Sequence, residues 1–124
     1  MSSTMSTPLV LSYAGCSTCK KALSWLTAHD VQPKVRPIVD EPPTRTELKS
    51  WIGKSGLPVR RWLNTSGLSY RALGKAAVDG MTDGQLVDAL AADGKLVRRP
   101  VLVLGERVLV GFDERAYAAL LDGS

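Results

Sequence analysis

The sequence predicts an α/β fold in which helices flank a four-stranded mixed sheet. A short apolar run near the start, residues 9–13, passes through a glycine into a pattern of helical period, as a buried strand followed by a helix does. Helix-capping signals fill the middle of the chain, and residues 101–110 return to strand patterns before one last helix. We therefore expect a β-α-β part, a helical insertion and a β-β-α part.

The first strand and the first helix meet at two cysteines. Gly15 permits a turn after the strand, which places Cys16 at the helix N-terminus and Cys19 one turn further in. From Thr18 onward the apolar side chains follow helical spacing, and they are Ala22, Leu23, Trp25, Leu26 and later His29. His29 is the only histidine of the chain, and we interpret it as a surface residue at the helix end rather than a catalytic base.

The position of Cys16 predicts a reactive thiol. The free N–H groups and the dipole of a first helical turn favour a negative charge, and Lys20 and Lys21 follow closely, so Cys16 is expected to ionise more readily than an ordinary thiol. Three residues of separation let Cys19 reach back to Cys16 and resolve a mixed disulfide formed there. The pair is therefore predicted to act as nucleophile and resolving cysteine.

Two other interpretations of the cysteine pair are open. A zinc site needs four ligands, whereas this chain holds two cysteines and one histidine, so we expect no metal. Both cysteines could also be inert packing, because cysteine is among the most buried residue types. The strand-to-helix context favours redox chemistry over both alternatives.

Length and composition bound the protein's class. A chain of 124 residues is expected to form one domain, residues 8–124, after a flexible leader of residues 1–7 that lacks the basic and apolar segments of a signal peptide. The formal charge of +4 comes from scattered residues, which argues against a dedicated nucleic-acid surface. No run approaches the length of a membrane span. With a sparse thiol pair, the expected compartment is the reducing cytoplasm.

The middle of the chain is expected to be mostly helical after a second strand, residues 34–39. Pro37 in that strand indicates a sheet edge, because proline donates no ladder hydrogen bond. Thr44 and Glu47 form a capping-box pattern that begins a helix over residues 45–54, with Leu48, Trp51 and Ile52 buried. Further helical segments are predicted at residues 59–63, opened by Pro58, at residues 70–73, closed by Gly74, and from a second capping box at Thr82 and Gln85 to residue 93.

The end of the chain predicts a hairpin and a helix. Residues 101–104 and 107–110 are strands joined by a tight turn, and Asp113 caps a last helix with Ala116, Tyr117, Leu120 and Leu121 on one side. This element order is that of the thioredoxin-like fold. In such sheets the proline before the third strand is commonly cis and faces the active-site cysteine, which makes Pro100 the candidate here. The alternative is a trans proline that merely begins the strand.

Several motifs together resemble a known family, the arsenate-reductase-like proteins of the thioredoxin superfamily, which include glutaredoxin-coupled arsenate reductases and Spx-type transcription regulators. The matching segments are Cys16-Ser-Thr-Cys19-Lys-Lys-Ala, Glu41-Pro-Pro-Thr-Arg-Thr-Glu-Leu48, Ser55-Gly-Leu-Pro58, Asn64-Thr-Ser-Gly67, Leu96-Val-Arg-Arg-Pro100 and Val108-Leu-Val-Gly-Phe-Asp113. They extend over nearly the whole chain and are far more specific than the cysteine pair alone.

The resemblance implies a site. In the arsenate reductases of this family a cysteine at the position of Cys16 attacks the oxyanion and three arginines hold it, of which Arg60 and Arg99 resemble two. The third position falls near Val110, where arginine is absent, and the loss of one bidentate cation is expected to weaken arsenate binding. Those reductases also lack a cysteine at position 19 and pass their oxidised sulfur to glutathione.

The expected function is that of a thiol-dependent reductase. Cys16 would attack an oxyanion, a glutathione-linked substrate or a protein disulfide, Cys19 would resolve the product, Arg99 and Arg60 would hold an anionic group, and Pro100 would shape the substrate groove. The resemblance implies no bound cofactor, and glutathione, glutaredoxin or thioredoxin as reductant. The rival prediction is an Spx-like redox-sensing regulator that binds the α subunit of RNA polymerase without turnover.

Overall fold

The protein's structure is a computed structural model that describes residues 7–122, so the predicted leader lies outside the described residues except for Thr7. The chain divides into two compact units. The first, called the thiol unit below, is formed by the two ends of the chain, up to Arg36 and from Arg99 onward. The second, the helical unit, is Pro37–Arg98. The single domain of residues 8–124 stays a prediction.

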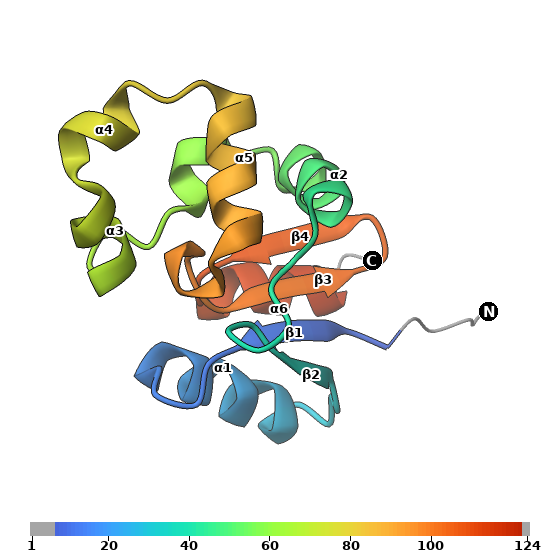
Figure 1. Ribbon diagram of the computed structural model, residues 1–124. Helices are drawn as coiled ribbons and strands as arrows, with labels where there is room; N and C mark the ends of the chain where they lie inside the picture. Colours follow the sequence, from blue (N-terminus) through green and yellow to red (C-terminus); the bar gives the residue numbers. More distant parts are fainter. Residues whose placement is uncertain (1–6, 123–124) are drawn as a thin grey trace. The chain divides into compact units, whose positions relative to one another are not determined.

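The sheet is the four-stranded mixed sheet that the sequence predicts. Its strands are β1 (Leu9–Ser12), β2 (Lys34–Pro37), β3 (Val101–Leu104) and β4 (Arg107–Val110), in the order β2-β1-β3-β4 (Figure 1). Strand β3 pairs antiparallel with β1, where Val10 lies opposite Leu102, and with β4, where Leu102 lies opposite Leu109. The hairpin therefore has the predicted bounds, and the thioredoxin-like arrangement is confirmed.

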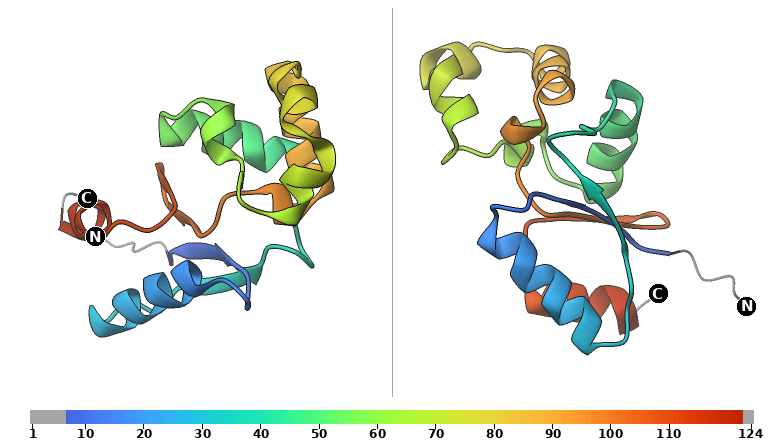
Figure 2. Two further views of the ribbon diagram at one scale, coloured as in Figure 1. Left: turned by 90° about the vertical axis from the view of Figure 1, so that its left-hand side faces the viewer. Right: turned by 60° about the horizontal axis from the view of Figure 1, so that its bottom comes forward.

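Two helices, α1 (Ser17–Ala28) and α6 (Glu114–Asp122), lie along one face of this sheet (Figure 2). Their buried side chains share one apolar core with the strands, formed by Val10, Ala22, Leu26, Leu102, Tyr117 and Leu120. Each helix contributes residues four or three positions apart, as the predicted helical spacing requires. Asp113 accepts a hydrogen bond from the Ala116 N–H at 3.3 Å and so caps α6 as expected.

Strand β2 lies at a sheet edge, as Pro37 predicts, but it ends earlier than expected. The predicted strand ran to residue 39, whereas β2 ends at Pro37 and the carbonyl of Pro37 accepts the Glu41 N–H at 2.8 Å in a turn. Proline lacks the N–H that would continue the ladder, so an apolar continuation at Ile38 and Val39 does not extend the strand.

The helical unit consists of α2 (Arg45–Ser55), the 3₁₀ helix η1 (Val59–Trp62), α3 (Leu68–Leu73), α4 (Lys75–Asp79), α5 (Asp83–Ala92) and the 3₁₀ turn η2 (Gly94–Leu96). Both predicted capping boxes are present. Thr44 accepts the Glu47 N–H at 3.1 Å and Thr82 accepts the Gln85 N–H at 3.2 Å, and the Glu47 and Gln85 side chains each accept a cap N–H at 2.9 Å. Gly74 closes α3 as expected.

Three details of the helical unit differ from the prediction. Helix α4 was not expected, because residues 75–79 are too few to display a helical period. The segment at residues 59–63 is a 3₁₀ helix that ends at Trp62, since the residues beside Pro58 form only one tight turn. Ile52 is only partly buried, while Leu48 and Trp51 are buried as predicted. None of the helices within residues 7–122 is long and apolar enough to span a bilayer.

Candidate redox site

Cys16 occupies the N-cap of α1, as the sequence predicts. Its backbone is extended (φ −98°, ψ 113°), and its N–H donates to the carbonyl of Tyr13 at 3.0 Å, which closes the turn between β1 and α1. Its sulfur accepts the backbone N–H of Cys19 at 3.2 Å. The thiol therefore takes the place that serine, threonine or aspartate usually holds at a helix start, facing free N–H groups.

The surroundings of Cys16 stabilise its thiolate. Partial burial alone would raise the pKa of Cys16, but hydrogen bonds from the thiol and the backbone N–H of Cys19, followed by the hydrogen bond and charge of Arg99, bring it below its ordinary value. The cation that the structure places at this sulfur is thus Arg99, and not Lys20 or Lys21 as predicted. Both lysines have exposed side chains on α1.

Cys19 has the opposite character. Its side chain is fully buried in the first turn of α1, and burial, together with the hydrogen bond that its thiol donates to Cys16, raises its pKa to about 11. The Tyr13 N–H and the Ser12 hydroxyl act in the other direction but do not offset this. Both cysteines are reduced. The surroundings therefore favour ionisation of Cys16 and retention of the proton on Cys19.

Arg99 lies beside Cys16 in the thiol unit, and Pro100 follows Arg99 in the chain. The Arg99–Pro100 peptide bond is cis, as predicted. Pro100 is buried, and its carbonyl accepts the Gly111 N–H at 2.7 Å, which ties it to the end of β4. The guanidinium of Arg99 lies over the ring of Tyr13, with its Cζ 4.9 Å from the ring centroid, and hydrogen-bonds the Cys16 sulfur. The structure thus brings Cys16, Cys19 and Arg99 together, with Pro100 as the next residue of the chain.

Arg60 belongs to the helical unit and has different partners. Its guanidinium donates to the carbonyls of Val78 at 3.1 Å, Asp79 at 3.3 Å and Met81 at 2.9 Å, at the end of α4. These contacts satisfy carbonyls that a helix end leaves without intrahelical partners. The substrate-binding role of Arg60 stays a prediction. Val110, at the position of the missing third arginine, ends β4 and is partly buried.

Two residues of the site have roles that the sequence did not reveal. Ser12 is the last residue of β1 and only 7% exposed, and its hydroxyl hydrogen-bonds the Cys19 sulfur. Tyr13 contributes its backbone to the turn and its ring to Arg99. The only sequence signal for Ser12 is a hydroxyl at the end of an apolar run.

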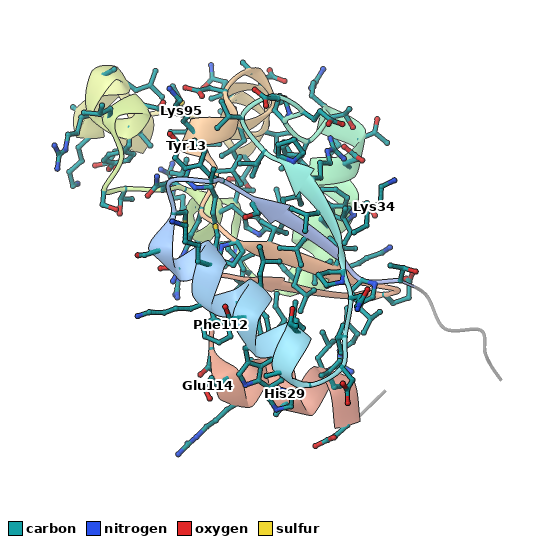
Figure 3. All side chains as sticks on the ribbon, turned by 90° about the horizontal axis from the view of Figure 1, so that it is seen from below. Tyr13, His29, Lys34, Lys95, Phe112 and Glu114 are labelled. Carbon is teal, nitrogen blue, oxygen red and sulfur yellow. The ribbon has the colours of Figure 1, made fainter. Side chains whose placement is uncertain are left out.

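His29 lies at the opposite end of α1 from Tyr13 (Figure 3). It is exposed, caps the helix and stacks on Trp25 with the ring centroids 3.8 Å apart, which confirms its interpretation as a helix-end surface residue. Within residues 7–122, no three histidine, cysteine or carboxylate side chains are gathered closely enough to hold a metal ion.

Comparison with known proteins identifies the family. The model of the ArsC family matches residues 11–120. The chain belongs to the ArsC family. Among curated relatives, the uncharacterised protein YusI of Bacillus subtilis (strain 168) is 41% identical over 103 residues, which cover 82% of this chain and 87% of YusI. The regulatory protein MgsR of the same strain is 30% identical over 102 residues, with 82% of this chain and 80% of MgsR covered.

A solved structure supports the same assignment. The crystal structure of an ArsC-family-related protein from Bacteroides fragilis superposes with a TM-score of 0.88 at 43% identity, covering 92% of this chain and 97% of that one. The predicted resemblance to arsenate-reductase-like proteins is therefore confirmed. Proteins similar to this chain include a possible arsenate reductase from Streptococcus mutans UA159, whose crystal structure is 32% identical, and the regulatory protein MgsR, so family membership alone does not separate the two functions.

Proposed function

We propose that this ArsC-family protein is a thiol-dependent oxidoreductase in which Cys16 is the nucleophile and Cys19 the resolving cysteine. The observation that carries the proposal is the contrast between the two sulfurs. The pKa of Cys16 lies below its ordinary value, while that of Cys19 is raised to about 11, although the two residues are one helical turn apart. A two-cysteine reductase needs this asymmetry, because the attacking sulfur must be ionised first.

With a disulfide substrate the reaction has two exchange steps. The Cys16 thiolate attacks one sulfur of the substrate disulfide, a mixed disulfide forms, and the other substrate sulfur leaves as a thiolate. In the mixed disulfide the Cys16 sulfur carries no charge, so it no longer raises the pKa of Cys19. Cys19 passes its proton to the leaving thiolate and attacks the Cys16 sulfur. The second substrate sulfur leaves as a thiolate, which takes a proton from solvent, so the substrate has gained two electrons and the protein holds a Cys16–Cys19 disulfide.

An external thiol must return those electrons. Glutathione, glutaredoxin or thioredoxin would reduce the Cys16–Cys19 disulfide, and no bound cofactor takes part. The cytoplasm, where these reductants are abundant, is the proposed compartment. In the substrate complex Arg99 would hold an anionic group such as a glutathione carboxylate or an oxyanion, with Pro100 shaping the groove.

Arsenate is a weaker candidate substrate than a disulfide. Attack of Cys16 on arsenic with loss of water, followed by attack of Cys19 on the Cys16 sulfur, would release arsenite and leave the same protein disulfide. Valine at position 110 in place of the family's third arginine removes one holder of the oxyanion.

The test is consumption of NADPH by the wild-type protein with a glutathione mixed disulfide, glutathione and glutathione reductase, and in parallel with arsenate plus glutaredoxin. Cys16→Ser should abolish turnover of either substrate. Cys19→Ala should accumulate a protein that carries one glutathionyl group on Cys16, detected as an intact mass. Turnover by folded Cys16→Ser protein would exclude the proposed mechanism.

The second candidate function is a redox-sensing regulator without turnover. It is favoured by the relative MgsR, a regulatory protein that is 30% identical and matched over 82% of this chain. Closing the Cys16–Cys19 disulfide would then change a surface that binds the α subunit of RNA polymerase. Capture of that subunit by oxidised but not reduced protein, lost in Cys16→Ser, would support this function, and equal capture in both states would contradict it.

A further inference from the structure

Tyr13 contacts Cys16 and Cys19 through its backbone and Arg99 through its ring. We propose that Tyr13 is a positioning residue whose ring face holds the Arg99 guanidinium at the Cys16 sulfur. The inference rests on the proposed function, because it assigns a part of that same site. In this role Tyr13 acts through Arg99, over which its ring lies.

The ring of Tyr13 provides the platform for Arg99. The Arg99 Cζ lies 4.9 Å from the ring centroid, within the range in which a guanidinium is attracted to an aromatic face. Arginine has many rotamers, and a planar guanidinium that is stacked on a ring loses most of them before it meets a sulfur or a substrate. The ring therefore keeps the cation in the position where it favours the Cys16 thiolate.

The backbone of Tyr13 joins the ring to both cysteines. Its carbonyl accepts the Cys16 N–H at 3.0 Å, and its N–H hydrogen-bonds the Cys19 sulfur. The same residue thus holds the cysteine turn with its main chain and the cation with its side chain.

The Tyr13 ring also lies against Gly15. A Cβ built on Gly15 would lie 3.0 Å from Cε2 of Tyr13 and 3.5 Å from Cζ, closer than ordinary van der Waals contact for the first atom. Gly15 has no left-handed φ, and the three atoms nearest to an added Cβ all belong to the Tyr13 ring. Glycine at this position leaves the space in which the ring lies.

The ring face, rather than the phenol hydroxyl, is what the interaction with Arg99 uses. This distinction supplies a matched pair of variants. Tyr13→Phe keeps the ring and its quadrupole, whereas Tyr13→Leu keeps the apolar bulk and removes the ring. Both should retain the backbone hydrogen bonds of residue 13, because neither change alters the main chain.

The test is the rate at which iodoacetamide alkylates Cys16, measured by mass spectrometry across a pH series, with and without Arg99→Leu. Tyr13→Phe should match the wild type. At pH values below the midpoint of the Cys16 titration, Tyr13→Leu should slow alkylation about two- to fivefold. This is the fold-change that corresponds to the free energy of an exposed cation–π interaction. In the Arg99→Leu background, Tyr13→Leu should change nothing further, as expected for a residue that acts only through Arg99.

The outcomes separate this inference from the proposed function. Unchanged alkylation in Tyr13→Leu, or an equal slowing in the presence and absence of Arg99, would overturn the role of Tyr13 while leaving the redox activity intact. An ordinary thiol profile for wild-type Cys16 would instead remove the basis of the proposed function. Gly15→Ala offers a second check, because it should slow alkylation when Tyr13 is present and have no effect in Tyr13→Leu.

Discussion

Arg99 in the thiol unit and Arg60 in the helical unit are the two arginines for which the family motifs imply one shared role, and the structure gives them different partners. Arg99 lies on an aromatic ring and hydrogen-bonds a reactive sulfur. Arg60 donates to three main-chain carbonyls at the end of a helix. A family motif can thus identify an arginine without revealing whether its guanidinium contacts a reactive side chain or main-chain carbonyls.

Both units bury apolar side chains, and they differ in what the structure adds to that burial. In the thiol unit, helices α1 and α6 cover one face of the sheet and share an apolar core with it. The helical unit has buried side chains of its own, among them Leu48, Trp62 and Leu86, and adds two complete capping boxes and the close approach of Gly94 to the main chain of Ile38. We expect substitutions in the helical unit to act mainly on folding, and substitutions around Cys16 to act mainly on thiol reactivity.

The largest expected effect tests the close backbone approach in the helical unit. A Cβ on Gly94 would overlap the carbonyl oxygen of Ile38, which is main chain and cannot rotate away. Gly94→Ala should therefore lower the free energy of unfolding by on the order of 3 kcal/mol, measured by urea denaturation. Gly53→Ala is the matched control, because nothing lies within 4 Å of its added Cβ, and it should be neutral or slightly stabilising.

The next effect tests the contrast between the two arginines directly. Arg60→Leu should lower the free energy of unfolding by about 1 kcal/mol, because it removes the donors to three carbonyls in hydrogen bonds of which only the one to Val78 is partly buried. It should leave the alkylation profile of Cys16 unchanged. At pH values below the midpoint of the Cys16 titration, Arg99→Leu should slow alkylation of Cys16 by about three- to tenfold. If Arg60→Leu slowed alkylation as much as Arg99→Leu, the contrast would be wrong.

The pH dependence of stability distinguishes the two sulfurs. In the folded protein the pKa of Cys19 is raised from the ordinary 9.0 to about 11. Its contribution to the free energy of unfolding is therefore fully present below pH 9 and is lost as the pH rises toward 11. The free energy of unfolding of the reduced protein should fall over that interval, and the fall should be smaller in Cys19→Ala. Burial raises the pKa of Tyr117 as well, so a decline of the same sign remains in that variant.

Cys16 contributes with the opposite sign, because its pKa is lowered in the folded protein. Its stabilisation is present above the ordinary pKa of 9.0 and is lost as the pH falls through the folded value. Comparing wild type with Cys16→Ser below pH 9 isolates this contribution. A stability difference that rose as the pH fell would contradict the thiolate assignment.

The smallest effect compares helix caps in the two units. Thr82 and Gln85 satisfy two backbone N–H groups at the start of α5, whereas Asp113 accepts one N–H at 3.3 Å at the start of α6. Thr82→Ala should lower the free energy of unfolding by about 1 kcal/mol, and Asp113→Ala by less. The hydrogen bond from the backbone N–H of residue 82 to the Gln85 side chain survives Thr82→Ala, so equal losses in urea denaturation would show that the Thr82 hydroxyl is worth no more as a cap than the Asp113 carboxylate.

Local patterns predicted most of the secondary structure and the centre of the site. The capping boxes, the hairpin at residues 101–110 and the helix that begins after Cys16 depend on neighbours within a few residues, so the sequence shows them directly. Short elements were harder. Helix α4 has five residues, fewer than two turns, and an apolar Ile38 after Pro37 suggested a longer strand than the edge supports.

The sequence by itself determined the fold class and the position of the two cysteines at a helix start, because periodicity, turn residues and caps are encoded locally. Only the tertiary structure decided which cation meets the thiol. Lys20 and Lys21 are close to Cys16 in sequence, yet Arg99, brought from the far end of the chain by the pairing of β1 with β3, is the one that hydrogen-bonds its sulfur. Side-chain contacts between distant segments depend on strand register and packing, and no local pattern encodes them.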